Sequence, residues 1–186
     1  MKFFLSIVFV LLTKLLSAQS SSTPDSSYER LIKSMNPKAY AQIGHSYPKF
    51  SFKVNEKIIS NEMLKGKVIF INFWFEGCHP CIAEMDALNE LFDTLKNRND
   101  FMFLSFSKDD VETVKRVQQK FKLKYDVISA TDQECMRLNL DSGYPTSIII
   151  DKAGIMKFYH TGGPIDKEKA RQRVIGILLP EIQSLL

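Results

Sequence analysis

The sequence has little of what disulfide-built or metal-binding proteins use. Its 186 residues include three cysteines, Cys78, Cys81 and Cys135, and three histidines. A scaffold that disulfides hold together needs several cysteine pairs, so the class of small disulfide-rich secreted proteins is excluded. One close pair with one distant thiol points instead to chemistry at the pair.

The chain also has only a small net charge. The chain has 25 Lys and Arg residues against 21 Asp and Glu, a net charge of +4. Residues 1–18 contain Lys2 and Lys14 and no acidic residue, so the rest of the chain has 23 basic residues against 21 acidic ones, a net charge of +2. This balance lacks the basic excess typical of nucleic-acid binding, and we expect no nucleic-acid partner.

No apolar run is long enough to span a bilayer. The first run covers residues 3–12, and Lys14 interrupts it well short of the roughly 20 residues that a spanning helix needs. With Lys2 before it and Ala18 after it, the run is typical of a secretory signal peptide. We predict a signal peptide at residues 1–18, a periplasmic or otherwise extracytoplasmic location, and no stable membrane insertion after its removal. A retained membrane anchor is the alternative.

The remaining chain reads as a leader and one domain. Residues 19–46 begin serine-rich and are predicted to be a flexible leader with a possible short helix at 28–36, stopped by Pro37.

Residues 47–186 form the predicted domain. Alternating or continuous apolar residues predict a hairpin over 50–59 and strands over 67–75, 101–107, 125–130, 146–151 and 155–160. Helical spacing predicts helices over 80–97, 111–122 and 132–140, and a final helix that starts near Asp166 and is kinked or ended by Pro180. This order predicts an α/β fold with a mixed central sheet, helices on both faces and an N-terminal β-hairpin.

The chemistry is concentrated in NFWFEGCHPC, residues 72–81. Cys78 follows a predicted buried strand, and His79 and Pro80 open the next helix, where proline fits the first turn. A cysteine at a helix N-terminus favours the thiolate, which is the nucleophile. Cys81, one turn later, can resolve a mixed disulfide at Cys78. A zinc site would need a second ligand pair, and an inert disulfide with so short a loop would stabilise little.

Three segments carry a family resemblance. NFWFEGCHPCIAEM resembles the active-site segment of the thioredoxin superfamily, in particular the TlpA/ResA-like branch of exported thiol–disulfide oxidoreductases. FSFKVNEKIISNEMLKGK is similar to the hairpin that precedes it in that branch, and GYPTSIIIDKAGIMKFYHTG to the cis-proline segment and the strand hairpin after it. The resemblance covers roughly residues 47–180. It implies a thioredoxin-like fold and a thiol–disulfide oxidoreductase, with no cofactor and no metal.

The resemblance also implies roles for single residues. Cys78 matches the attacking cysteine and Cys81 the resolving one, the two forming a redox disulfide. Trp74 matches the tryptophan packed beneath this pair; an ordinary core aromatic is the alternative. Pro145 matches the cis-proline that faces the disulfide, and Tyr144 before it would offer backbone hydrogen bonds to an extended substrate. A trans proline that starts a strand is the alternative at Pro145.

Two neighbouring positions set this chain apart from cytosolic thioredoxin. Asn72 stands where that protein has a buried aspartate, so proton transfer must use another group. The TlpA/ResA-like branch also carries a glutamate three residues after the second cysteine, and Glu84 occupies that place, on the same helix face as Cys81. The resemblance therefore implies that Glu84 is catalytic and either takes the proton from the resolving thiol or holds a water that does; a solvated surface acid is the alternative. His79 and Pro80 are assigned to substrate binding. A protonated His79 would make the pair more oxidising, whereas an exposed neutral histidine would have no such effect.

The expected activity is reduction of disulfides in substrate proteins. The resemblance implies a membrane electron donor and a role such as cytochrome c maturation. A disulfide oxidant or isomerase is one alternative. A thiol peroxidase is another, although Phe75 stands where such enzymes have threonine. A copper or haem chaperone using His160 is a third. Cys135 is expected to be a quiet core thiol.

Overall fold

The computed structural model describes residues 26–54 and 57–186. The chain divides into an N-terminal unit, residues 1–34, and a compact unit, residues 35–186. The predicted signal peptide at residues 1–18 lies outside the described residues. Among the helices that the structure describes, none is long and apolar enough to cross a membrane.

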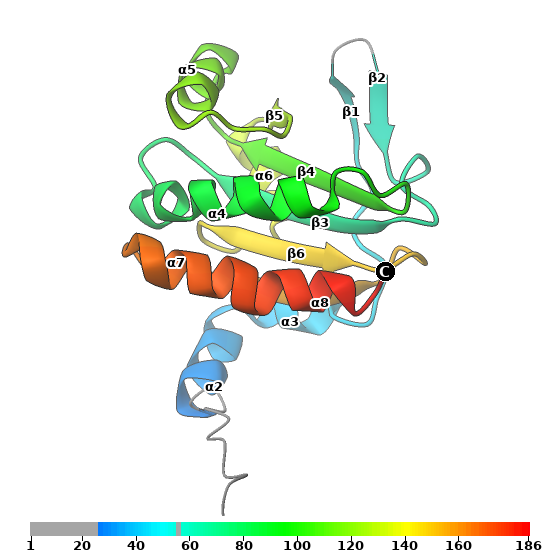
Figure 1. Ribbon diagram of the computed structural model, residues 1–186. Helices are drawn as coiled ribbons and strands as arrows, with labels where there is room; N and C mark the ends of the chain where they lie inside the picture. Colours follow the sequence, from blue (N-terminus) through cyan, green and yellow to red (C-terminus); the bar gives the residue numbers. More distant parts are fainter. Residues whose placement is uncertain (1–25, 55–56) are drawn as a thin grey trace, which may run out of the picture. The chain divides into compact units, whose positions relative to one another are not determined.

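A five-stranded mixed sheet forms the centre of the compact unit (Figure 1). Its strands are β5 (Val127–Ser129), β4 (Phe101–Ser107), β3 (Val68–Trp74), β6 (Thr146–Ile150) and β7 (Met156–Thr161), in this spatial order. The central strand β3 pairs in parallel with β4 and antiparallel with β6. The predicted strands and the mixed α/β architecture are therefore confirmed.

The predicted N-terminal hairpin forms a separate two-stranded sheet. Strand β1 (Ser51–Val54) pairs antiparallel with β2 (Lys57–Ser60), and Phe52 lies opposite Ile59. Both side chains are partly buried against the main core. The alternation of apolar residues predicted this hairpin because one of its faces packs on the domain.

Both faces of the sheet are covered, which explains the almost continuous apolar run of β3. Successive β3 side chains point to opposite faces. One set, Ile69, Ile71 and Phe73, packs against helices α3 (Pro37–Gln42) and α6 (Asp132–Leu138) and the segment around Phe50. On the other face, Val68 and Phe70 pack against α4 (His79–Leu95) and the C-terminal helices. Figure 1 shows α4 and the C-terminal helices side by side across this face.

Two prolines lie at or near helix ends, and each has an effect beyond the one predicted. Helix α2 (Ser26–Met35) stops before Pro37 as expected, but Pro37 also begins α3, because a first-turn proline has no N–H to lose. The final helix does not end at Pro180. After α7 (Lys167–Arg173) it widens into a π-helical segment, η1 (Val174–Leu178), and continues as α8 (Leu179–Gln183). The wider π geometry relieves the clash that Pro180 would cause in a regular α-helix.

Candidate active site

The candidate active site begins where β3 delivers the chain to the N-terminus of α4. Cys78 is the N-cap residue of α4, and Pro80 lies in its first turn. Cys78 and Cys81 form a disulfide with their Cα atoms 5.2 Å apart. The Cys78 sulfur accepts a hydrogen bond from the backbone N–H of Cys81 at 3.3 Å. A sulfur thus occupies the capping position that oxygen atoms of Asp110 and Asp166 fill in α5 (Val111–Phe121) and α7.

The disulfide is recessed in an apolar cluster. Cys78 is 5% exposed and Cys81 1%, and they pack with Trp74 and Met85. Trp74 is itself buried, and its indole N–H donates to the Ser105 hydroxyl at 2.9 Å. This bond satisfies the polar atom of Trp74 and fixes its ring. The tryptophan therefore lies in the same cluster as the redox pair, as its predicted role requires.

Glu84 is buried one helical turn beyond Cys81. Its two carboxylate oxygens each accept a 3.0 Å hydrogen bond, Oε1 from the Asn72 amide and Oε2 from the Arg173 guanidinium. Burial raises the pKa of Glu84 to about 7, while Arg173 and then Asn72 act to lower it. The surface-acid alternative for Glu84 is therefore wrong, and its pKa lies in the range that a proton-transfer group at neutral pH needs.

The loop before β6 contains the expected cis bond, between Tyr144 and Pro145. Within this loop the Asn139 side chain bonds the backbone of Ser142 in both directions, at 3.0 and 3.1 Å. The Tyr159 hydroxyl donates to the Ser142 hydroxyl at 2.6 Å. The loop is thus held by side-chain bonds in addition to strand pairing.

The Tyr144 ring contacts the loop that leads to Cys78. It packs edge-on against Phe75, with the ring centroids 5.2 Å apart. The Lys108 ammonium lies over both rings, 4.8 Å from the Phe75 centroid and 5.4 Å from that of Tyr144. Tyr144 is only half-buried, so this aromatic pair forms part of the surface beside the disulfide.

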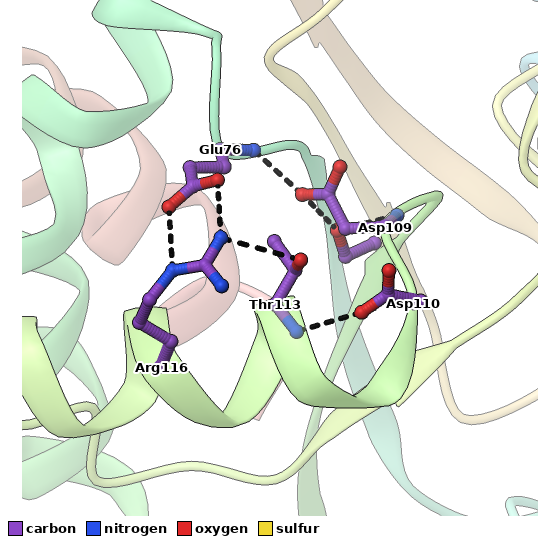
Figure 2. A network of polar contacts seen from close by, with 6 residues as sticks. Glu76, Asp109, Asp110, Thr113 and Arg116 are labelled. Atoms are coloured by element: carbon purple, nitrogen blue, oxygen red, sulfur yellow. Dashed lines mark hydrogen bonds and ion pairs between the residues drawn. The ribbon is translucent and has the colours of Figure 1, made fainter.

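A polar network holds the other side of the same loop (Figure 2). The backbone N–H of Glu76 donates to the Asp109 carboxylate at 2.6 Å. Arg116, on α5, donates to both Glu76 carboxylate oxygens, at 3.2 and 2.7 Å. Its guanidinium also contacts the Thr113 hydroxyl at 3.3 Å. Arg116 holds the pKa of the exposed Glu76 carboxyl below its usual range.

His79 is exposed and lines an open groove beside the disulfide. The groove has a volume of about 640 Å³ and an apolar floor that includes Ile82 and Phe121. Lys120 and Lys167 also line it. Because Glu76 lines it as well, the groove combines an apolar surface with charged groups of both signs.

Two further predicted residues lie away from the redox pair. Cys135 is a free, buried thiol in the main core, and burial raises its pKa to about 12. Its predicted burial in the core is therefore confirmed, and its lack of a chemical role stays a prediction. His160 contacts the Glu181 carboxylate at 2.6 Å. Among the described residues, no group of three or more His, Cys, Asp or Glu side chains comes together to hold a metal.

Sequence reasoning missed Arg173 and the Glu76–Arg116 pair. Arg173 bonds a carboxyl 89 positions earlier in the chain, and Arg116 lies 40 positions from Glu76. A single charged residue on an amphipathic helix carries no local signal of such a partner. Only the packing of α7 and α5 against the active-site segment reveals them.

Comparison with known proteins places this geometry in a family. A model of the AhpC/TSA family matches residues 43–159. The thiol-disulfide oxidoreductase ResA of Bacillus thuringiensis (strain Al Hakam) is 35% identical over 115 residues, which are 61% of this chain and 66% of that protein. The match thus spans slightly less than two thirds of the length of that relative.

Solved structures support the fold. The thiol:disulfide interchange protein of the thioredoxin family from Chlorobium tepidum TLS aligns with a TM-score of 0.57 and 27% identity, over 72% of this chain and 95% of that one. The thiol-disulfide oxidoreductase from Bacteroides fragilis NCTC 9343 aligns with a TM-score of 0.60 and 21% identity, over 76% and 99% of the two chains. The predicted thioredoxin-like fold is therefore confirmed.

Proposed function

The chain belongs to the AhpC/TSA family, and on that premise we propose that it is an exported thiol–disulfide oxidoreductase that reduces disulfides in substrate proteins. The observation that carries the proposal is the Cys78–Cys81 disulfide at the N-terminus of α4. A helix N-terminus favours a thiolate at Cys78 once the disulfide is reduced. The names of the relatives support the same reaction class.

The reaction uses two thiol–disulfide exchanges. The Cys78 thiolate attacks one sulfur of the substrate disulfide, forms a mixed disulfide and releases the first substrate thiolate, which takes up a proton. Cys81 then loses its proton and attacks the Cys78 sulfur. This closes the Cys78–Cys81 disulfide and releases the second substrate thiolate, which is also protonated. Two electrons pass to the substrate, and a thiol reductant must restore the dithiol.

Glu84 is proposed to accept the proton that Cys81 loses. It is buried on the same helix, one turn after Cys81, with a pKa of about 7. Trp74 and Pro80 would shape the surface around the pair. Tyr144 and Pro145 would bind the substrate backbone, and His79 would contact the substrate from the groove.

The cellular setting follows from the N-terminal sequence. Residues 1–18 have the layout of a signal peptide, so we propose an extracytoplasmic location, the periplasm in a cell with two membranes. An oxidising compartment requires a supply of electrons, which we propose comes from a membrane donor. Cytochrome c maturation is one process that needs reduced thiols in such a compartment.

An insulin-reduction assay tests the proposal. The wild type is expected to catalyse reduction and Cys78→Ser to be inactive. Cys135→Ser is the matched control: it also removes one sulfur, but from a buried thiol in the main core, and should keep the activity. Equal rates for wild type and Cys78→Ser would end the proposal. The reduction potential of the pair, measured against glutathione, then tests the direction of electron flow.

A further inference from the structure

The Glu84 carboxyl is held from two different elements of the fold. Asn72 reaches it from β3, and Arg173 reaches it from the end of α7, each at 3.0 Å. The ion pair between Glu84 and Arg173 is largely buried, with side-chain exposures of 2% and 14%. The last residue of α7 is thus part of the surroundings of the redox pair.

The Arg173 guanidinium lies close to both prolines of the active site. A methyl group built onto Gly163 would lie 3.4 Å from Arg173 Nη1, 3.4 Å from Pro145 Cγ and 3.7 Å from Pro80 Cβ. The Arg173 guanidinium, Pro145 and Pro80 therefore all lie around Gly163, which has no side chain. The π-helical segment η1 begins directly after Arg173.

This arrangement does not maximise hydrogen bonding among the protein groups, which is compatible with a role other than stability. Arg173 Nη2 and Asn72 Oδ1 are buried and have no protein hydrogen-bond partner in the described part of the chain. A buried donor or acceptor without a partner costs free energy, and a buried ion pair seldom stabilises more than well-packed apolar residues do.

The other titratable groups near Glu84 do not supply a positive charge. Burial raises the pKa of the Tyr125 phenol, which is therefore neutral at physiological pH. Asn72 cannot ionise, and Cys78 and Cys81 are joined in the disulfide. Arg173 is the strongest influence that opposes the effect of burial on Glu84.

We propose that Arg173 is a positioning residue for the Glu84 carboxyl, which it orients on the helix that carries Cys81 and whose charged, proton-accepting form it stabilises. The inference rests on the proposed function, because the proton in question is the one that Cys81 loses. When Cys81 attacks Cys78 in the mixed disulfide, its proton passes to the Glu84 carboxylate. Without Arg173, less of Glu84 is ionised at neutral pH and the resolving step slows.

The first experiment titrates Glu84 directly and needs no activity. Infrared spectra of oxidised, ¹³C-glutamate-labelled protein are recorded against pH, and the band lost in Glu84→Gln is assigned to this residue. Arg173→Met should raise its midpoint by at least about one pH unit, and Arg173→Lys should raise it less. Arg171→Met is the matched control, because Arg171 lies on α7 like Arg173 but forms an exposed ion pair, with Glu90 of α4. An unchanged midpoint in Arg173→Met would overturn the proposal.

The second experiment measures the resolving step against pH. Relative to wild type, Arg173→Met should close the Cys78–Cys81 disulfide about tenfold more slowly at pH 6 and less than about twofold more slowly at pH 9. In a Glu84→Gln background the same substitution should leave the shape of the pH profile unchanged. An equal loss of rate at all pH values would indicate a merely structural role and refute the inference.

The two experiments separate this inference from the proposed function. Suppose that Arg173→Met raises the infrared midpoint of Glu84 but the wild type does not reduce insulin. The proposed function would then be contradicted, while the effect of Arg173 on Glu84 would stand. If Arg173→Met does not fold, Arg173→Gln replaces it, because glutamine keeps an amide donor and removes only the charge.

Discussion

Two glutamate–arginine pairs lie on either side of the chain segment that carries the cysteines, and they differ in almost every physical respect. Glu84 and Arg173 are 2% and 14% exposed, whereas Glu76 and Arg116 are 44% and 58% exposed. The buried pair is joined by one hydrogen bond and the exposed pair by two. The pKa of Glu84 is raised to about 7, and that of Glu76 is lowered.

The difference teaches that burial decides the net direction of the pKa shift, while the arginine partner lowers the carboxyl pKa in both pairs. Both glutamates have an arginine within hydrogen-bond distance. For Glu84 the loss of hydration on burial outweighs the attraction of Arg173, so the acid holds its proton up to neutral pH. For Glu76, water screens and solvates the pair, so the exposed pair fixes a loop and has little other effect.

The largest expected effect is a dependence of folding stability on pH that comes from Glu84. Its pKa is about 7 in the folded oxidised protein, against about 4.5 in an unfolded chain. Between these pH values the folded state holds a proton that the unfolded chain has lost, so stability falls as the pH rises from 4.5 to 7. The loss attributable to Glu84 should be on the order of 3 kcal/mol.

Urea unfolding of oxidised wild type and Glu84→Gln at several pH values measures this effect. The difference between their free energies of unfolding isolates the contribution of Glu84 from that of the other acids. It should change across pH 4.5 to 7 and stay constant above that window. If the free energies of unfolding of the two proteins changed in parallel with pH, the pKa of Glu84 would be the same in the folded and unfolded states.

The next effect concerns the rate of the resolving step. Glu84→Gln removes the proposed proton acceptor and should slow closure of the Cys78–Cys81 disulfide roughly 100-fold at neutral pH. Stopped-flow fluorescence of Trp74, which packs in the same cluster as the cysteines, follows the step. Asp86→Asn is the control, because Asp86 is an exposed acid on the same helix. A loss of equal size in both variants would contradict the assignment.

The smallest effect is expected at the exposed pair. Arg116→Met should change the rate of disulfide exchange by less than about twofold, and any loss of stability should disappear at high salt. The contribution of Glu76 should be lost as the pH falls through its lowered pKa, which is the reverse of the sign for Glu84. Thermal unfolding of wild type, Arg116→Met and Arg173→Met at low and high salt measures the loss of stability in each variant. If the stability loss in Arg116→Met did not depend on salt, the exposed pair would behave like a buried one and this prediction would be wrong.

Much of the fold could be predicted because hydrophobic periodicity is a local property. The apolar run of β3 and the helical spacing after Cys81 each indicate burial within a few residues, and the structure confirms both elements. The stop before Pro37 was predicted, but the helix that starts at Pro37 and the continuation of the last helix through Pro180 were not. A proline that stops one helix can start the next, and a proline near a helix C-terminus is tolerated when the preceding turn widens.

The candidate site also contains residues that the sequence predicts and residues that only the structure reveals. The redox pair, the cis bond before Pro145 and the position of Glu84 were predicted because sequence spacing and family resemblance carry them. Arg173 was not, since its role depends on how α7 packs against α4. The environment of Glu84 could not be predicted either, because residues from β3 and α7 create it jointly.

On the proposed function, the recessed position of Cys78 decides at which stage of its folding a substrate protein can be attacked. Only 5% of this residue is exposed, and a new bond between two sulfurs brings them to about 2 Å. A disulfide buried inside a folded domain is shielded by its own chain, which hinders so close an approach. A disulfide in a nascent or loosened chain is less shielded. We expect the folding stage of the substrate protein, more than its local sequence, to decide which disulfides are opened.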